Sequence, residues 1–151
     1  MVHKVMVHYE RGNLLDAPVN YICHQVNCQG VMGAGIAKQI KERWPRVYQE
    51  YSNWYASCED MLGLIQTVHI DGGPSVINMA AQRFYGNRGK FTSYDAFWNC
   101  LNEIRREVPK GSKIGFPWGI GCGLGGANWQ VISAMICEAL GRDYEVYIYQ
   151  L

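Results

Sequence analysis

Apolar side chains recur along this chain with two periods, and the two periods predict strands that alternate with helices. Val5, Val7 and Tyr9 occupy every second position, which is typical of a half-buried strand. Between residues 97 and 108 apolar side chains instead recur at helical spacing. Thr92 and Asp95 match a capping box in front of that segment, so we expect the helix to begin there.

The same patterns extend over the rest of the chain. They predict further strands over residues 20–26, 64–70, 75–81, 113–118 and 145–151, and helices over residues 36–43, 47–57 and from Asn128 to Leu140. Pro45 is expected to stop or kink the first helix, and Asn128 to cap the last one. Alternating strands and helices predict an α/β sandwich whose central sheet is mixed and mainly parallel. Such sheets bind ligands outside the carboxyl ends of their strands.

Composition narrows the classes of protein that this sandwich can represent. The 151 residues fit one domain, and 48% of them are hydrophobic. The net charge is only +1, from 14 basic and 13 acidic side chains, which argues against nonspecific nucleic-acid binding. The N-terminus has no apolar signal core and no stretch is long enough to span a bilayer, so we expect a cytoplasmic protein with no membrane partner.

Cysteines and histidines give no metal signature. None of the six cysteines forms a C-x-x-C pair, which disfavours a zinc ribbon, and we expect them to be reduced. His3, His8, His24 and His69 lack ligand spacing. We therefore expect neither a metal nor a cofactor.

Two glycine-rich segments each connect a predicted strand to a predicted helix. They span residues 30–35 and 119–126. Glycines allow a close backbone approach, and a helix N-terminus offers unpaired amides with partial positive charge. Two such loops at one sheet edge suit a ligand with two linked phosphates. Neither a Walker loop nor, in the first segment, the Rossmann fingerprint is present.

The combination and order of several motifs resemble the macrodomain family over essentially the whole chain. The segments that carry this resemblance are Gly12-Asn13-Leu14-Leu15, His24 to Gly30, Met32 to Ala37, Pro117 to Leu124 and Val146 to Leu151. The resemblance implies a three-layer α/β/α macrodomain over residues 1–151 that binds ADP-ribose or a derivative. It is strongest to two branches, the ADP-ribose-1''-phosphate phosphatases and the glycohydrolases that remove terminal ADP-ribose from protein or nucleic acid.

The resemblance also implies which residues contact the ligand. Asn13 and Tyr149 correspond to positions near the adenine, and Asn27 to one that faces the distal ribose. The remaining positions lie beside Asn13 or in the two phosphate loops, and they are Leu14, Gly33, Ala34, Gly35, Ile36, Gly119, Ile120, Gly121, Cys122, Gly123 and Leu124.

Two positions depart from the glycohydrolase pattern. One branch of that group uses a Lys nucleophile and an Asp, where this chain has Gln82 and Gly125. Lys90 lies further on, in the segment from Gln82 to Phe91, which is either an ordinary surface loop or a lid that covers the ligand with Arg83 or Arg88.

These departures leave hydrolysis of ADP-ribose-1''-phosphate as the leading expectation, with His24 as acid or base and Asn27 as a second catalytic residue. A lone buried histidine is more often a structural core residue than a catalytic one, and Asn27 could serve only a turn. The alternatives are a glycohydrolase that uses substrate-assisted water attack on ADP-ribosylated protein or nucleic acid, and a non-catalytic reader of ADP-ribose. Cys122 is expected to line the loop rather than to act as a nucleophile.

Overall fold

The computed structural model describes residues 4–86 and 91–151. Along the chain its elements are β1 (Val7–Arg11), the short 3-10 helix η1 (Leu14–Asp16), β2 (Tyr21–Val26), α1 (Gly35–Arg43), α2 (Pro45–Ser57), β3 (Ile65–Val68), β4 (Ser75–Ala80), α3 (Tyr94–Glu107), β5 (Lys113–Pro117), α4 (Trp129–Leu140) and β6 (Glu145–Gln150). The predicted order of strands and helices is confirmed. Across these ranges, no helix is both long and apolar enough to cross a membrane.

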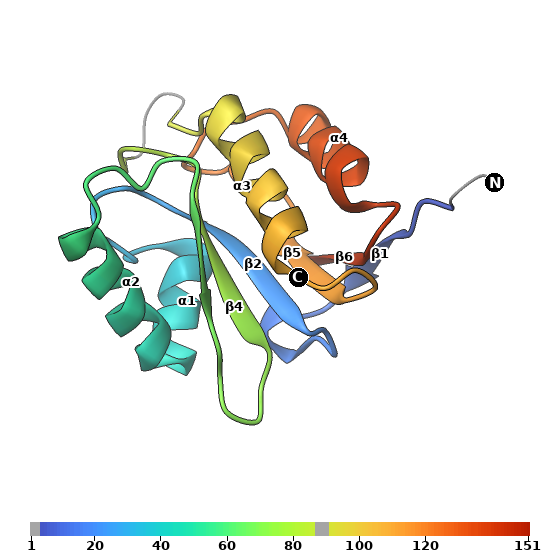
Figure 1. Ribbon diagram of the computed structural model, residues 1–151, viewed down its shortest axis with the longest axis horizontal. Coiled ribbons are helices and arrows are strands. Elements are labelled where there is room, and N and C mark those ends of the chain that lie inside the picture. Colours follow the sequence, from blue (N-terminus) through green and yellow to red (C-terminus); the bar gives the residue numbers. More distant parts are fainter. Residues whose placement is uncertain (1–3, 87–90) are drawn as a thin grey trace.

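A six-stranded sheet with the order β1-β6-β5-β2-β4-β3 forms the middle layer. Every neighbouring pair is parallel except β3 and β4. Helices α1 and α2 cover one face and α3 and α4 cover the other (Figure 1). The predicted three-layer α/β/α architecture with a mixed, mainly parallel sheet is therefore confirmed.

Each face of the sheet has its own apolar core. Ile40, Val47 and Tyr51 of α1 and α2 are fully buried against one face. On the other face α3 and α4 pack through Phe97 and Ile136, which are also fully buried. These two cores hold β2 and β5 at the centre of the sheet. Because these two strands are parallel neighbours, the loops that follow them lie side by side.

Two local predictions are corrected by the structure. The α3 helix is capped by Ser93, whose Oγ accepts a hydrogen bond from the Ala96 amide at 3.1 Å, and not by Thr92. The first helix ends at Arg43, just before Pro45 as predicted, and Pro45 begins α2 at a first-turn position, where the missing N–H costs nothing. Residues 7–11 form an edge strand in which Tyr9 is 60% exposed, so β1 is more exposed to solvent than the half-buried strand that was predicted. Asn128 caps α4 as predicted, accepting from the amides of Gln130 and Val131.

Candidate functional site

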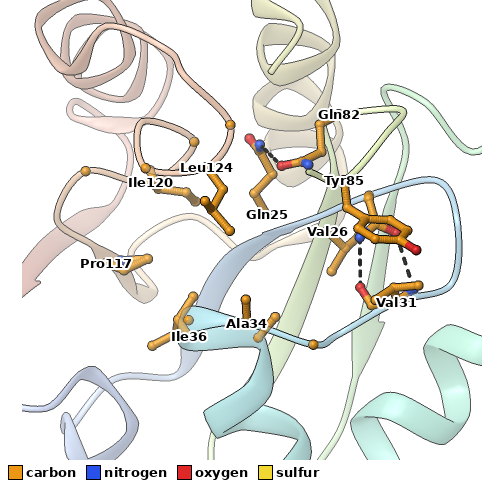
Figure 2. Close-up of a pocket in the computed structure, with 18 of the residues that line it drawn as sticks. Gln25, Val26, Val31, Ala34, Ile36, Gln82, Tyr85, Pro117, Ile120 and Leu124 are labelled. Carbon is orange, nitrogen blue, oxygen red and sulfur yellow. Dashed lines mark hydrogen bonds between the residues drawn. The ribbon is translucent and has the colours of Figure 1, made fainter. Parts of the chain in front are cut away.

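A cleft of about 670 Å³ opens at the carboxyl ends of β2 and β5. That volume lies within the range of roughly 300–1,000 Å³ typical of small-molecule sites. Figure 2 shows the second glycine loop on one side of the cleft, with Ile120 and Leu124, and α1 below it, with Ala34 and Ile36. The predicted residues that line it are Asn27, Gly33, Ala34, Gly35, Ile36, Gly119, Ile120, Gly121, Gly123 and Leu124.

The first glycine segment brings the start of α1 to the cleft. Ala34 is the N-cap residue and makes no side-chain capping bond, so the first amides of α1 lack a capping side chain. Gly35 opens the helix with a φ of +57°, a conformation that favours glycine. The positive end of the helix dipole therefore faces a cleft with no capping carboxylate, which suits an anion.

Asn27 lines the cleft and organises the loop between β2 and α1. Its Oδ1 accepts hydrogen bonds from the amides of Gln29 at 3.0 Å and Val31 at 3.3 Å, and its Nδ2 donates to the Val31 carbonyl at 2.8 Å. The buried Tyr51 hydroxyl contacts the same group, with 2.8 Å to Asn27 Oδ1 and 2.6 Å to the Asn27 carbonyl. Asn27 is thus the structural centre of a turn that faces the cleft.

The segment that precedes α3 forms hydrogen bonds with the second glycine loop. The Gly125 carbonyl accepts from the amides of Phe91 at 2.8 Å and Thr92 at 2.9 Å. A Cβ on Gly125 would lie 2.3 Å from Thr92 Oγ1 and 2.5 Å from the Gly121 carbonyl oxygen. Position 125 therefore has no room for the Asp that one glycohydrolase branch places there.

Three polar residues that were not predicted to belong to the site meet beside the cleft, and two of them, Gln25 and Gln82, line it. Gln25 Nε2 donates to Gln82 Oε1 at 2.7 Å and to Thr92 Oγ1 at 2.8 Å. Figure 2 shows the contact between the two glutamines above Tyr85. Gln82, at the position where the resemblance to the glycohydrolase branch implies a Lys, lines the cleft. The only sequence signal for Gln25 is its polarity near the carboxyl end of a buried strand.

The structure does not bring His24 to the cleft, which corrects the expectation of a catalytic imidazole. His24 is fully buried, and its Nε2 lies 2.5 Å from Oδ1 of Asn78, its neighbour across β2 and β4. Burial lowers its pKa to about 4, although the hydrogen bond with Asn78 acts in the opposite direction. A neutral ring held inside the sheet cannot exchange a proton with a ligand in the cleft.

Four other predicted residues do not line the cleft. Asn13 caps η1 by accepting from the Leu15 amide at 3.0 Å, and Leu14 is buried below it. Tyr149 of β6 pairs with Pro117, and its carbonyl accepts from the Trp118 amide at 2.8 Å. Cys122 directs its thiol to the Ile120 carbonyl, and burial raises its pKa, which agrees with a non-nucleophilic role.

The segment from Gln82 to Phe91 is described only in part. Tyr85 and Gly86 line the cleft, and the Tyr85 amide donates to Gln29 Oε1 at 2.9 Å. Arg83 instead lies 3.5 Å from Asp60 at the surface. Arg88, which the lid hypothesis invoked, and Lys90 both lie outside the described residues.

The cleft wall is uncharged over the part of the chain that the structure describes. No Asp, Glu, Lys or Arg of residues 4–86 and 91–151 lines it. The same ranges hold no group of three His, Cys, Asp or Glu side chains placed to bind a metal ion. Backbone amides, the side-chain amides, the Tyr85 hydroxyl and the Trp118 indole N–H are therefore the polar groups that these residues offer to a ligand.

No family model matches this chain. The DNA ADP-ribosyl glycohydrolase of Mycobacterium tuberculosis is 30% identical over 149 residues, which cover 95% of this chain and 42% of that protein. The protein of the same name from Thermus aquaticus is 31% identical over 155 residues, which cover 96% of this chain and 41% of that protein. The chain thus spans about two fifths of the length of these curated relatives.

Solved structures give the same grouping. The macrodomain of Mycobacterium tuberculosis DarG has a TM-score of 0.80 and 27% identity, covering 97% of this chain and 99% of that one. The macrodomain of Thermus aquaticus DarG has a TM-score of 0.80 and 28% identity, with the same coverage. Thermosipho africanus DarTG, solved in complex with ADP-ribose, shares the fold at a TM-score of 0.80 and 22% identity, covering 94% of this chain and 41% of that one.

Proposed function

Because this chain belongs to the macrodomain family, we propose that its residues form a single macrodomain whose cleft binds ADP-ribose and hydrolyses an ADP-ribosyl linkage. The proposal depends on one observation: both glycine segments and the start of α1 line the same uncharged cleft. Two neighbouring sets of backbone amides suit a pyrophosphate, which carries two linked anionic groups.

Binding through amides explains why the cleft needs no basic side chain among the described residues. The first amides of α1 approach the cleft from one side, and the loop from Gly119 to Gly125 approaches it from the other. Gly119 and Gly121 have φ values of +76° and +77°, so this loop follows a path that favours glycine at both positions. Asn27 would then face the sugar beyond the phosphates, from a turn that its own hydrogen bonds hold rigid.

Among the possible reactions, removal of ADP-ribose from a macromolecule is better supported than hydrolysis of ADP-ribose-1''-phosphate. The similar proteins from two organisms are named DNA ADP-ribosyl glycohydrolases. The phosphatase reading depended on His24, which is buried beside Asn78 and away from the cleft. We therefore place ADP-ribosylated nucleic acid first among the substrates, and ADP-ribosylated protein and ADP-ribose-1''-phosphate after it.

The chemistry proposed for this cleft is direct attack by water. Gln82 occupies the position of the Lys nucleophile, and an amide nitrogen has no basic lone pair with which to attack the anomeric carbon. Water would form the new bond to that carbon, the bond to the substituent would break, and the proton of the water would end on the leaving group. The bound pyrophosphate supplies a base, and the turn around Asn27 positions the distal ribose.

A side-by-side assay tests this proposal. Calorimetry should show ADP-ribose binding more tightly than AMP, because only ADP-ribose reaches both glycine segments and Asn27. The protein is then incubated with an ADP-ribosylated DNA oligonucleotide, an ADP-ribosylated protein and ADP-ribose-1''-phosphate, and released products are quantified. Equal affinity for AMP and ADP-ribose would overturn the binding proposal, and release only from ADP-ribose-1''-phosphate would overturn the glycohydrolase assignment.

The uncharged cleft wall favours one second candidate, a non-catalytic reader of ADP-ribosylated macromolecules. Neither the Lys nor the Asp of the covalent glycohydrolase branch is present at the corresponding positions, Gln82 and Gly125. Tight binding of ADP-ribose with no release from any of the three substrates would select this function.

A further inference from the structure

Gln25 connects three segments that are distant in sequence, two of which line the cleft. It lies on β2, directly before Val26, the last residue of the strand. Its Nε2 donates both to Gln82, on the segment after β4, and to Thr92, which precedes α3. Thr92 Oγ1 in turn donates to the Gly121 carbonyl of the second glycine loop at 2.7 Å.

Two backbone carbonyls determine which way every group in this network faces. At one end the Gly121 carbonyl can only accept, so the Thr92 hydroxyl donates to it and accepts from Gln25. At the other end the Phe84 carbonyl accepts from Gln82 Nε2 at 2.7 Å, which turns Gln82 Oε1 toward Gln25. Both N–H groups of Gln25 are therefore used inside the network.

The unpaired oxygen of Gln25 does not reverse this assignment. Its Oε1 is buried and has no hydrogen-bond partner among the described residues. Rotating the amide by 180° would direct that oxygen at Thr92 and Gln82. Thr92 would then have to donate to Gln25 and lose its hydrogen bond to the Gly121 carbonyl, and Gln82 Oε1 would face another oxygen. The orientation is thus set by the whole network rather than by the surroundings of Gln25 alone.

We propose that Gln25 is a positioning residue that holds Gln82 as a hydrogen-bond donor toward the ligand. Gln82 Oε1 is occupied by Gln25, and one Nε2–H is occupied by the Phe84 carbonyl. The second Nε2–H of Gln82 has no partner in the described part of the chain, and Gln82 lines the cleft. The side chain at this position therefore donates to a ligand oxygen. This inference rests on the proposed function, because the ligand that supplies the oxygen is ADP-ribose.

A double-mutant cycle on ADP-ribose affinity tests whether Gln25 acts through Gln82. We expect Gln82→Leu to weaken ADP-ribose binding by about tenfold, the equivalent of one hydrogen bond to a charged or polar oxygen. Gln25→Leu should weaken it to a similar extent, and the double variant should be no weaker than Gln82→Leu alone. Gln130→Leu, on the exposed side of α4 and away from the cleft, is the matched control and should bind as the wild type does.

Gln25→Glu covers the case in which the leucine variant fails to fold. A carboxylate of the same shape cannot donate to Gln82 Oε1 or to Thr92, so the same weakening of ADP-ribose binding is expected. The unpaired buried oxygens should also lower the melting temperature, and circular dichroism at the assay temperature shows whether the variant is folded. Unchanged affinity in Gln25→Glu, or additive losses in the double variant, would overturn the positioning role.

Side-chain amide NMR of the unliganded protein gives a second, ligand-independent measurement. The Gln82 amide should give two well-dispersed resonances that collapse toward free glutamine values in Gln25→Glu. Unchanged Gln82 resonances would contradict the inference. Failure of the wild-type protein to bind ADP-ribose would overturn the proposed function instead, and the NMR result would still decide whether Gln25 holds Gln82.

Discussion

Replacement of Tyr51 by Phe should destabilise the turn that faces the cleft without removing any apolar packing. The Tyr51 hydroxyl donates to the Asn27 carbonyl at 2.6 Å and accepts from the Gly30 amide at 3.1 Å. Burial raises the pKa of this hydroxyl, so it stays protonated over the range of any binding assay. Phenylalanine keeps the ring, which is fully buried in the core beneath α1 and α2, and removes only the oxygen.

The magnitude follows from what the lost oxygen leaves behind. A buried polar group without its partner costs about 1–3 kcal/mol, and Asn27 Oδ1 keeps its bonds from Gln29 and Val31. We therefore expect the free energy of unfolding to fall by about 2 kcal/mol in total. For a chain of this length each kcal/mol corresponds to roughly 2–4 °C, so the melting temperature should fall by about 4–8 °C.

Thermal unfolding by circular dichroism, together with calorimetry of ADP-ribose binding, measures both effects. ADP-ribose should bind more weakly to Tyr51→Phe, because the loop after β2 is less ordered before binding. Tyr55→Phe is the matched control, since Tyr55 lies one turn further along α2, is 44% exposed, and contacts the same loop at Gly30 through its ring. A Tyr51→Phe protein as stable as Tyr55→Phe would refute the reasoning.

Three further predictions concern the cleft and its surroundings. Gly125→Asp should lower both the melting temperature and the ADP-ribose affinity, because its Cβ would collide with Thr92 and the Gly121 carbonyl. Gly123→Asp is the control and should unfold at the wild-type temperature, because no atom lies within 4 Å of a Cβ at that position. Borohydride reduction during turnover of an ADP-ribosylated substrate should leave no adduct by mass spectrometry, because no lysine of the described residues lines the cleft; an adduct on Lys90 would contradict water attack. Burial lowers the pKa of His24 to about 4 in the folded protein, below that of free imidazole. Between about pH 6.5 and 4 the unfolded chain therefore binds more protons than the folded one, and the free energy of unfolding should fall as the pH falls through this range. The free energy of unfolding should change less steeply over the same range in His24→Asn, and an equal change in both proteins would argue against a neutral buried ring.

Local sequence patterns were sufficient for the fold and for much of the cleft wall. Strand and helix periods, the Asn128 cap and the two glycine segments depend on residues a few positions apart, so they can be recognised along the chain. Once the sheet is known to be parallel at β2 and β5, the loops after these strands must be neighbours. That is why the loops that contain Gly33 to Ile36 and Gly119 to Gly121 line one cleft.

Only the tertiary structure shows which polar residues meet beside the cleft. Gln25 lies 57 residues from Gln82 and 67 from Thr92, and no local pattern brings them together. Thr92 has the sequence features of a helix cap, yet Ser93 takes that role and leaves the Thr92 hydroxyl to hold the second glycine loop. His24 and Gln25 are adjacent polar residues in one strand, and successive side chains of a strand point to opposite faces. The sequence specifies that these two side chains alternate, but not which face of the sheet each one takes. The packing of strands and helices around β2 places Gln25 at the cleft and buries His24 beside Asn78.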